Sequence, residues 1–268
     1  VRSVVAYLYH EAAQAKTVDA REQLVKHAAR SESRRSLEAA EAVASSEPGV
    51  AVSVEEFDRH EWLFNAANGT LDLRTSCLTP HRREDMITKR ARFAFAADAV
   101  CPTWDAFLWR IMGERADLVE FLQRAVGYSL TGSVSEQSMF FCYGKGANGK
   151  STFIETLRHV FGDYSGAAKF DTFLANDNRS DAREDIARIR GSRFVSAVEG
   201  PEGERFDESA VKQLTGGDMI TARFLYENSF EFRPVCKIWL AANHKPAVKG
   251  EDDGIWRRLK LIPFTVSI

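Results

Sequence analysis

Residues 141–152, FCYGKGANGKST, contain the spacing G-x-x-x-x-G-K-[ST] between Gly144 and Ser151. Glycines in such a loop let backbone N–H groups turn inward onto phosphate oxygens. Lys150 could then reach the β and γ oxygens of a triphosphate, while the Ser151 hydroxyl ligates magnesium. An apolar run precedes the loop, and a helical pattern whose N-terminus favours anions follows it. The stretch therefore predicts a nucleotide site rather than a simple turn. The residues expected at it are Gly144, Lys145, Gly146, Ala147, Asn148, Gly149, Lys150, Ser151 and Thr152.

A carboxylate is the second group that such chemistry needs, to hold magnesium or its water and to orient an attacking water. Glu199 ends the run RFVSAVE and is the best candidate for both roles. Val198 precedes it, so a doubled acid is missing, and whether one carboxylate serves both roles stays open. The alternative is a surface residue of an acidic turn, because Glu202 and Glu204 follow closely.

An amide and a guanidinium complete the set of reactive side chains. Asn243 ends CKIWLAAN and could hydrogen-bond the γ-phosphate or the water, or simply form a turn. Arg257 and Arg258 stand side by side in DDGIWRRLK, and a guanidinium suits the charge that develops during phosphoryl transfer. Supplied by a neighbouring subunit, either arginine would make hydrolysis depend on assembly. Alternatively, one of them pairs with Asp252 or Asp253.

Three short apolar runs must position these groups: 138–144, 193–200 and 236–243. They do not alternate with polar residues, which predicts strands covered on both faces of a mainly parallel sheet. Each run ends in one of the candidate groups, and ligands of open α/β sheets collect at the carboxyl ends of strands. The fold class expected for residues 135–268 is therefore an α/β core.

Upstream of this core the pattern is mainly helical. Residues 1–48 have apolar positions at helical spacing, and the pattern returns between 101 and 132. Between these segments, alternating apolar residues flank Asn68-Gly69, which predicts a small β-hairpin. We expect an N-terminal domain over 1–100 and bridging helices over 101–134.

Composition limits the function classes. The 268 residues carry a formal net charge of only −2, so any nucleic-acid contact must be local. No apolar run approaches the ~20 residues that span a bilayer. The four cysteines lack metal-ligand spacing and predict reduced thiols. The expectation is a cytoplasmic protein without a membrane partner.

Seven stretches in the same order resemble superfamily 3 helicases, namely the helicase part of primase-helicases from phages, plasmids and large DNA viruses. They are NAANGTLDLRT, CPTWDAFL, FLQRAVGYSLTG, GKGANGKST, VKQLTGGDMITARFLYENSFEFRP, KIWLAANHKP and GIWRRLKLIPF. The resemblance implies an AAA+-like, P-loop ATPase preceded by a helical collar-type domain. It further implies ATP and Mg²⁺ as cofactors, DNA as partner, and a homo-oligomeric ring, usually a hexamer, in DNA replication.

The resemblance also assigns roles. Lys150 and Ser151 take the Walker A roles, Glu199 the Walker B role, Asn243 the sensor role, and Arg257 or Arg258 that of a finger acting in trans. The segment before Asn243 matches a DNA-gripping hairpin, here two strands joined around 227–229. Relatives tend to carry a lysine where Glu227 stands, so phosphate contacts would fall to other basic residues, and the alternative for each lysine is a solvated surface position. The candidates are Lys212, Arg223, Arg233, Lys245 and Lys249.

Two functions from different classes are consistent with these residues. The first is an ATP-driven helicase motor that translocates on DNA and unwinds it. The second is a nucleotide-dependent module that binds or loads at an origin without unwinding. A small-molecule kinase is disfavoured, because neither an arginine-bearing lid nor an acceptor pocket is visible. Flanking domains, and other replication proteins bound through them, would lie outside this chain.

Overall fold

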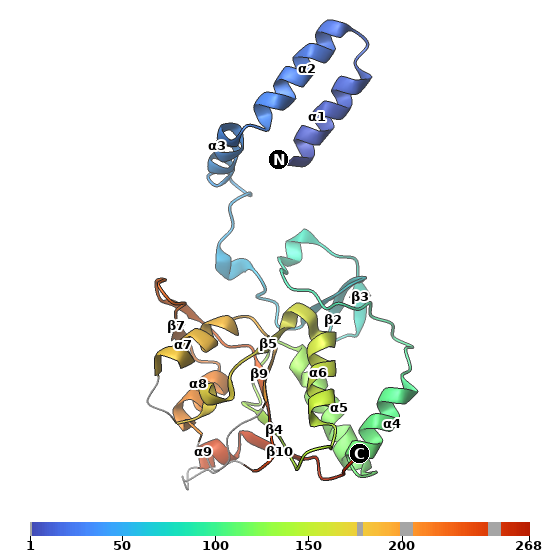
Figure 1. Ribbon diagram of the computed structural model, residues 1–268, viewed down its shortest axis with the longest axis vertical. Coiled ribbons are helices and arrows are strands. Elements are labelled where there is room, and N and C mark those ends of the chain that lie inside the picture. Colours follow the sequence, from blue (N-terminus) through green and yellow to red (C-terminus); the bar gives the residue numbers. More distant parts are fainter. Residues whose placement is uncertain (1, 176–178, 199–205, 246–252) are drawn as a thin grey trace. The chain divides into compact units, whose positions relative to one another are not determined.

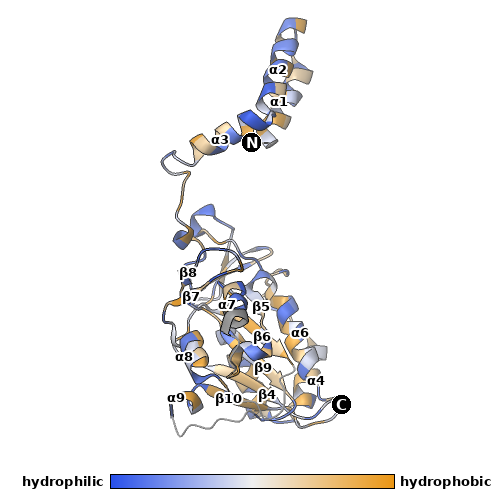
Figure 2. Ribbon diagram, turned by 60° about the vertical axis from the view of Figure 1, so that its left-hand side comes forward, coloured by the Kyte–Doolittle hydropathy of each residue, from blue (hydrophilic) through white to orange (hydrophobic). Residues whose placement is uncertain are grey.

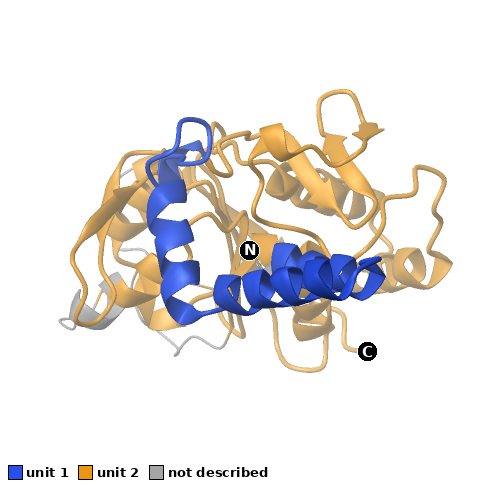
Figure 3. Ribbon diagram, turned by 90° about the horizontal axis from the view of Figure 1, so that it is seen from above, with its two compact units in different colours: residues 1–56 blue, residues 57–268 orange. Residues whose placement is uncertain are grey.

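The computed structural model describes residues 2–175, 179–198, 206–245 and 253–268. The chain forms two compact units, Val1–Glu56 and Phe57–Ile268 (Figure 3). The boundary differs from the one expected near residue 100, and the packing of residues 57–100 explains why.

The first unit is helical, as its apolar spacing predicts. Its helices are α1 (Arg2–Gln14), α2 (Val18–Ser31) and α3 (Arg34–Ala44), followed by the short helix η1 (Val54–Glu56). Hydroxyl caps begin two of them: Thr17 accepts from the N–H of Ala20, and Ser33 from that of Ser36. The buried apolar residues of this unit are few and small.

The second unit contains a parallel sheet of five strands in the order β10-β4-β9-β6-β5 (Figure 1). The three apolar runs form its centre as β4 (Met139–Tyr143), β6 (Phe194–Val198) and β9 (Lys237–Ala242). The flanking strands are β5 (Ser165–Ala167) and β10 (Leu259–Pro263), and all neighbouring strands pair in parallel. The predicted α/β fold is confirmed.

Both faces of this sheet are covered, because successive side chains of a strand point to opposite faces. Phe140 and Cys142 of β4 join one buried cluster, while Met139 and Phe141 join another. The two helical layers flank the sheet in Figure 1, and its strands are mostly orange, hydrophobic, in Figure 2. One layer comprises α4 (Pro102–Ile111), α5 (Ala116–Leu130) and α6 (Lys150–Phe161); the other comprises α7 (Arg179–Arg188), α8 (Glu208–Gly216) and α9 (Asp253–Trp256). Single turns lie at η3 (Gly162–Tyr164) and η4 (Phe170–Phe173).

A small antiparallel sheet, with a turn beside it, packs onto the first of these layers. Its strands are β1 (Leu63–Ala66), β2 (Gly69–Asp72) and β3 (Cys77–Thr79), followed by the turn η2 (Arg83–Asp85). Phe64 stacks on Tyr164 with ring centroids 4.6 Å apart, and the Asn65 N–H donates to the Tyr164 hydroxyl over 3.0 Å. These contacts place residues 57–100 with the sheet unit rather than with the N-terminal helices.

The predicted hairpin is present, but its turn lies one residue earlier than expected. Ala66 pairs with Gly69, so Ala67 and Asn68 form the connection. A Cβ on Gly69 would lie 2.5 Å from the Thr79 carbonyl oxygen. Glycine is required there because strand β3 approaches closely.

One buried lysine ties the α5–β4 connection to the amino end of β9. Lys237, 1% exposed, donates to the carbonyls of Thr131, Ser133 and Val235, the latter two over 3.1 Å. Its ammonium also lies 4.9 Å from the centre of the Tyr128 ring. Burial lowers the pKa of Lys237 to about 7, because the charged form loses its hydration.

We expect Lys237→Met to lower the free energy of unfolding at pH 7 by about 1–3 kcal/mol, because buried carbonyls lose their donor. Between pH 7 and 9 the unfolded chain retains a proton on Lys237 that the folded chain has released. The free energy of unfolding of the lysine protein should therefore rise with pH relative to that of the methionine protein, by up to about 1.4 kcal/mol per pH unit. Urea unfolding of both proteins at pH 7 and 9 measures this difference. Other ionising groups are common to both proteins and cancel, so a pH-independent difference would show that the lysine stays charged.

Candidate nucleotide-binding site

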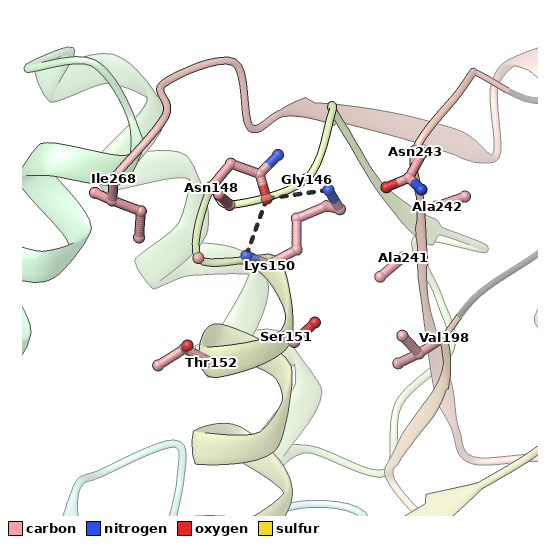
Figure 4. Close-up of a pocket in the computed structure, with 12 residues that line it drawn as sticks. Gly146, Asn148, Lys150, Ser151, Thr152, Val198, Ala241, Ala242, Asn243 and Ile268 are labelled. Carbon is pink, nitrogen blue, oxygen red and sulfur yellow. Dashed lines mark hydrogen bonds between the residues drawn. The ribbon is translucent and has the colours of Figure 1, made fainter.

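The loop and Asn243 meet at the carboxyl edge of the parallel sheet. In register, Tyr143 pairs with Ala242, and Val198 pairs with Ala241, so three strands end together. A cavity of about 720 Å³ opens at this edge. It is lined by 146–152 of the loop, Val198 of β6, Ala241, Ala242 and Asn243 at the end of β9, and Ile268 (Figure 4).

The loop between β4 and α6 owes its shape to residues in unusual backbone conformations. Ala147 and Gly149 have φ values of 57° and 81°, in the left-handed region. A Cβ on Gly144 would lie 1.9 Å from the Phe264 carbonyl oxygen, so only glycine fits where the loop leaves β4. The loop is thus turned over the N-terminus of α6, as the glycine spacing predicts.

Lys150 lies inside this turn. Its ammonium donates to the carbonyl of Gly144 and, over 3.0 Å, to Oδ1 of Asn148. Burial lowers the pKa of Lys150. Asn148 is buried as well, and its amide donates to the Phe264 carbonyl over 2.7 Å. Asn148 therefore fastens the loop to the segment after β10, a role that the motif alone did not reveal.

The two hydroxyls after the lysine lie differently. Ser151 points toward the ends of β6 and β9, whereas Thr152 points away from them (Figure 4). A hydroxyl oxygen suits a hard cation such as Mg²⁺, which is commonly held by few protein groups together with substrate phosphates and water. No cluster of three acidic, histidine or cysteine side chains occurs within the described residues. The Ser151 hydroxyl fits a magnesium that is shared with the phosphates of a nucleotide. Glu199, the predicted acid, lies outside the described residues.

Asn243 follows β9 directly and lines the cavity opposite the loop (Figure 4). The structure thus brings Asn243 together with Lys150 and Ser151, although they are far apart in sequence. This arrangement arises because β9 is the neighbour of β4 in the sheet. The chemical role of each group stays a prediction.

The paired arginines have opposite environments. Arg258 is 7% exposed and donates to the carbonyl of Gly254 over 2.6 Å and to Oε1 of Gln137 over 2.7 Å. Arg257 is exposed and does not line the cavity of its own chain. Arg258 therefore holds α9 to its own core, and Arg257 is the arginine presented at the surface.

The predicted hairpin forms from β7 (Ile220–Ala222) and β8 (Phe230–Phe232), which pair antiparallel. Arg223 and Arg233 follow its two strands and are exposed. The other basic candidates lie outside the hairpin. The Nζ of Lys212 is 3.9 Å from Oε2 of Glu208, and both residues belong to α8. The Nζ of Lys245 is 4.8 Å from the ring centre of Tyr143, beside the loop. Lys249 lies outside the described residues.

The hairpin loop carries a residue that basic-charge reasoning missed. Tyr226 is 97% exposed and has a φ of 65°, and Leu225 beside it is 64% exposed. A left-handed conformation in a bulky residue costs about 1–3 kcal/mol and is typical of functional loops. The sequence signal that could have identified Tyr226 is an aromatic residue directly before Glu227 in the predicted hairpin loop.

Comparisons with known proteins agree with the sequence motifs. Residues 1–113 match the family described as D5 N terminal like, and residues 142–258 match a family of unknown function, DUF5906. "Putative helicase L207/L206" of Acanthamoeba polyphaga mimivirus is 31% identical over 79% of this chain. "Putative primase C962R" of African swine fever virus is 24% identical over 77%. The chain spans 22% of the length of each of these two relatives.

A solved structure supports the fold. The apo C-terminal region of NrS-1 superposes with a TM-score of 0.51 at 13% identity, covering 63% of this chain and 39% of that one. The fold and the loop define an α/β protein with a glycine-rich loop between a parallel strand and a helix. Within that class, the predicted resemblance to helicases and primases of large DNA viruses is confirmed. Among the described residues, no helix is both long and apolar enough to cross a bilayer.

Proposed function

We propose that this chain is the ATP-hydrolysing motor of a DNA helicase. The observation that carries the proposal is the cavity at the carboxyl edge of the sheet, where the phosphate-binding loop faces Asn243 across a gap. The names of the relatives support a role in replication.

The residues of the cavity suit hydrolysis of ATP to ADP and phosphate by water. Backbone N–H groups of the loop and the N-terminus of α6 bind phosphate oxygens. Lys150 leaves its internal acceptors to bind the β and γ oxygens, a small movement within the same loop. Asn243 orients the attacking water or the γ-phosphate. Mg²⁺, when bound, supplies neutralisation of the phosphate charge, and Ser151 and Glu199 are the residues that would hold it.

Assembly into a ring would complete this site. Arg257 is at the surface and away from its own cavity, as a residue that serves a neighbouring copy must be. Head-to-tail contacts between identical chains close into rings when the rotation permits. A hexamer is the expected ring, by resemblance to superfamily 3 helicases.

The β7–β8 hairpin is the proposed contact with DNA. Tyr226 offers an exposed ring on which a base can stack, and such stacking is worth about 1–3 kcal/mol per base. Arg223 and Arg233 on the same hairpin can reach phosphates. One such hairpin per subunit gives a ring several contacts without a basic overall charge.

We expect single-stranded DNA to stimulate ATP hydrolysis, and the rate per chain to rise with protein concentration.

Tyr226→Ala should weaken DNA binding about 5- to 100-fold, since one stacked base is lost per subunit. Its basal ATPase rate should be unchanged, because Tyr226 does not line the cavity. Steady-state hydrolysis with and without DNA, and fluorescence anisotropy of a labelled oligonucleotide, measure these effects. Tyr9→Ala in the N-terminal unit is a matched control.

Strand displacement by the full-length protein separates a motor from a loader. Displacement that requires Lys150 and Tyr226 supports the motor. ATP-dependent binding without displacement would assign the chain to a loading module. A rate per chain that does not depend on concentration would contradict a shared site.

A further inference from the structure

A second cavity lies between the small antiparallel sheet and the segment that follows it. Its volume is about 290 Å³, and we name it the Asp85 cavity. It is lined by Asn65, Thr70, His81, Arg82, Arg83, Asp85, Ile87 and Arg90. The proposed function uses none of these residues.

The cavity is distant from the phosphate-binding loop. Arg90 and Asp163 exchange hydrogen bonds, from the Arg90 N–H to Oδ2 over 3.2 Å and from the Asp163 N–H to the Arg90 carbonyl over 3.1 Å. Asp163 follows the C-terminal end of α6, whereas the loop precedes its N-terminus. Twelve helical residues separate the two ends by about 18 Å. A ligand here would be independent of the nucleotide at the loop.

The charge of the lining favours an anion. Three arginines and one aspartate line the cavity. Arg82 pairs with Asp85 over 3.0 Å, and the exposed Arg83 pairs with Glu84 over 3.1 Å. In the described part of the chain, Arg90 takes part in no ion pair. Guanidinium groups bind phosphate with planar, paired hydrogen bonds.

Two residues that line the cavity have side-chain acceptors that lack donors. Asp85 is 6% exposed; its Oδ1 accepts from Arg82, but its Oδ2 is buried without a hydrogen-bond partner. Oδ1 of Asn65 is also buried without a hydrogen-bond partner. The Nδ2 of the same side chain donates to the Lys89 carbonyl over 3.0 Å, which fixes the orientation of the amide. Buried polar atoms usually have partners, so an unmet acceptor in the wall of a cavity points to a donor that a ligand in the cavity could supply.

We propose that the Asp85 cavity binds one nucleotide, its phosphate held by Arg90 and the neighbouring arginines and an amino group of its base donating to Asp85 and Asn65. Simple phosphate would satisfy the arginines but leave both acceptors without donors. The volume is at the lower end for ligand cavities, which suits a single nucleotide. Adenine, cytosine and guanine carry an exocyclic amine, whereas uracil and thymine do not. The nucleotide is either a free monophosphate or part of a single strand.

Photo-crosslinking with azidoadenosine monophosphate tests this proposal in the full chain. Lys150→Ala is used as background so that binding at the loop does not contribute, which also makes the outcome independent of the proposed ATPase. We expect labelled peptides from residues 65–90. AMP and CMP should compete at least tenfold better than UMP or inorganic phosphate.

Two substitutions and a matched control locate the contacts. Arg90→Gln should reduce labelling at least tenfold. Asp85→Asn keeps the oxygen that accepts from Arg82 but replaces the orphan acceptor by a donor, and should abolish the preference for AMP over UMP. Arg124→Gln removes an exposed arginine on α5 and should change nothing. Thermal melts of all variants verify that they are folded.

An oligonucleotide arm identifies the source of the nucleotide. In the Lys150→Ala/Tyr226→Ala background, competition by oligo(dA) stronger than by AMP assigns a nucleotide of a strand, and the reverse assigns a free monophosphate. Absence of label between 65 and 90 overturns the proposal. So does label that inorganic phosphate displaces as well as AMP does, or that Asp85→Asn leaves unchanged.

Discussion

Replacing Lys150 by alanine is expected to reduce the turnover number of ATP hydrolysis about 100- to 1000-fold, the cost of removing one donor that stabilises developing charge. Lys150 is the cation inside the loop, and its ammonium is held there by the carbonyl of Gly144 and by Asn148. A phosphate that enters the loop would take the place of these acceptors. Steady-state phosphate release measures the loss.

The control for this variant is Lys169→Ala, which removes an exposed lysine outside the cavity and should retain full activity. Because Lys150 also bonds its own loop, thermal melts must show that the variant remains folded. An active, folded Lys150→Ala protein would contradict the assignment of this cavity as the hydrolytic site.

Arg257→Ala is expected to reduce hydrolysis about 1000-fold or more, as loss of an arginine finger does, without loss of stability. Arg258→Ala should have the opposite signature. It removes buried hydrogen bonds to Gly254 and Gln137 and should lower the free energy of unfolding by about 2–4 kcal/mol. Hydrolysis and urea unfolding of both variants separate the two roles.

Mixing chains tests whether Arg257 acts in trans. An equal mixture of Lys150→Ala and Arg257→Ala chains should have about one quarter of its interfaces intact, because lysine and arginine come from neighbouring copies of a head-to-tail ring. Mixing Lys150→Ala with the double variant Lys150→Ala/Arg257→Ala leaves no intact interface and should stay inactive. Failure of the first mixture to recover any activity would contradict a shared site.

Much of the site followed from local patterns. The loop motif predicted where the chain would turn, and the apolar runs predicted β4, β6 and β9 with reactive groups at their ends. These predictions rest on nearest-neighbour physics: glycine permits left-handed backbone, and apolar residues without alternation require cover on both faces. The strand β5 was missed, because Ser165–Ala167 has no apolar run and owes its conformation to pairing with β6.

The different positions of the paired arginines could not be predicted in the same way. Arg257 and Arg258 are adjacent and identical in chemistry, and both follow Asp252 and Asp253 closely in sequence. The fold separates them, because Gln137 approaches Arg258 from more than a hundred residues away. The exposure of Tyr226 likewise depends on the pairing of β7 with β8. The packing of residues 57–100 against the sheet unit depends on contacts with Tyr164.

The amino-acid sequence by itself thus determined the class of fold, the loop and the strand ends at which chemistry could occur. The tertiary structure alone decided which groups share a cavity, which arginine reaches the surface, and that a second, arginine-lined cavity exists at the far end of α6. The physical reason is the separation along the chain over which each kind of interaction acts. Backbone preferences and apolar periodicity act over a few residues, whereas burial and hydrogen-bond partnership are set by contacts between segments that only folding brings together.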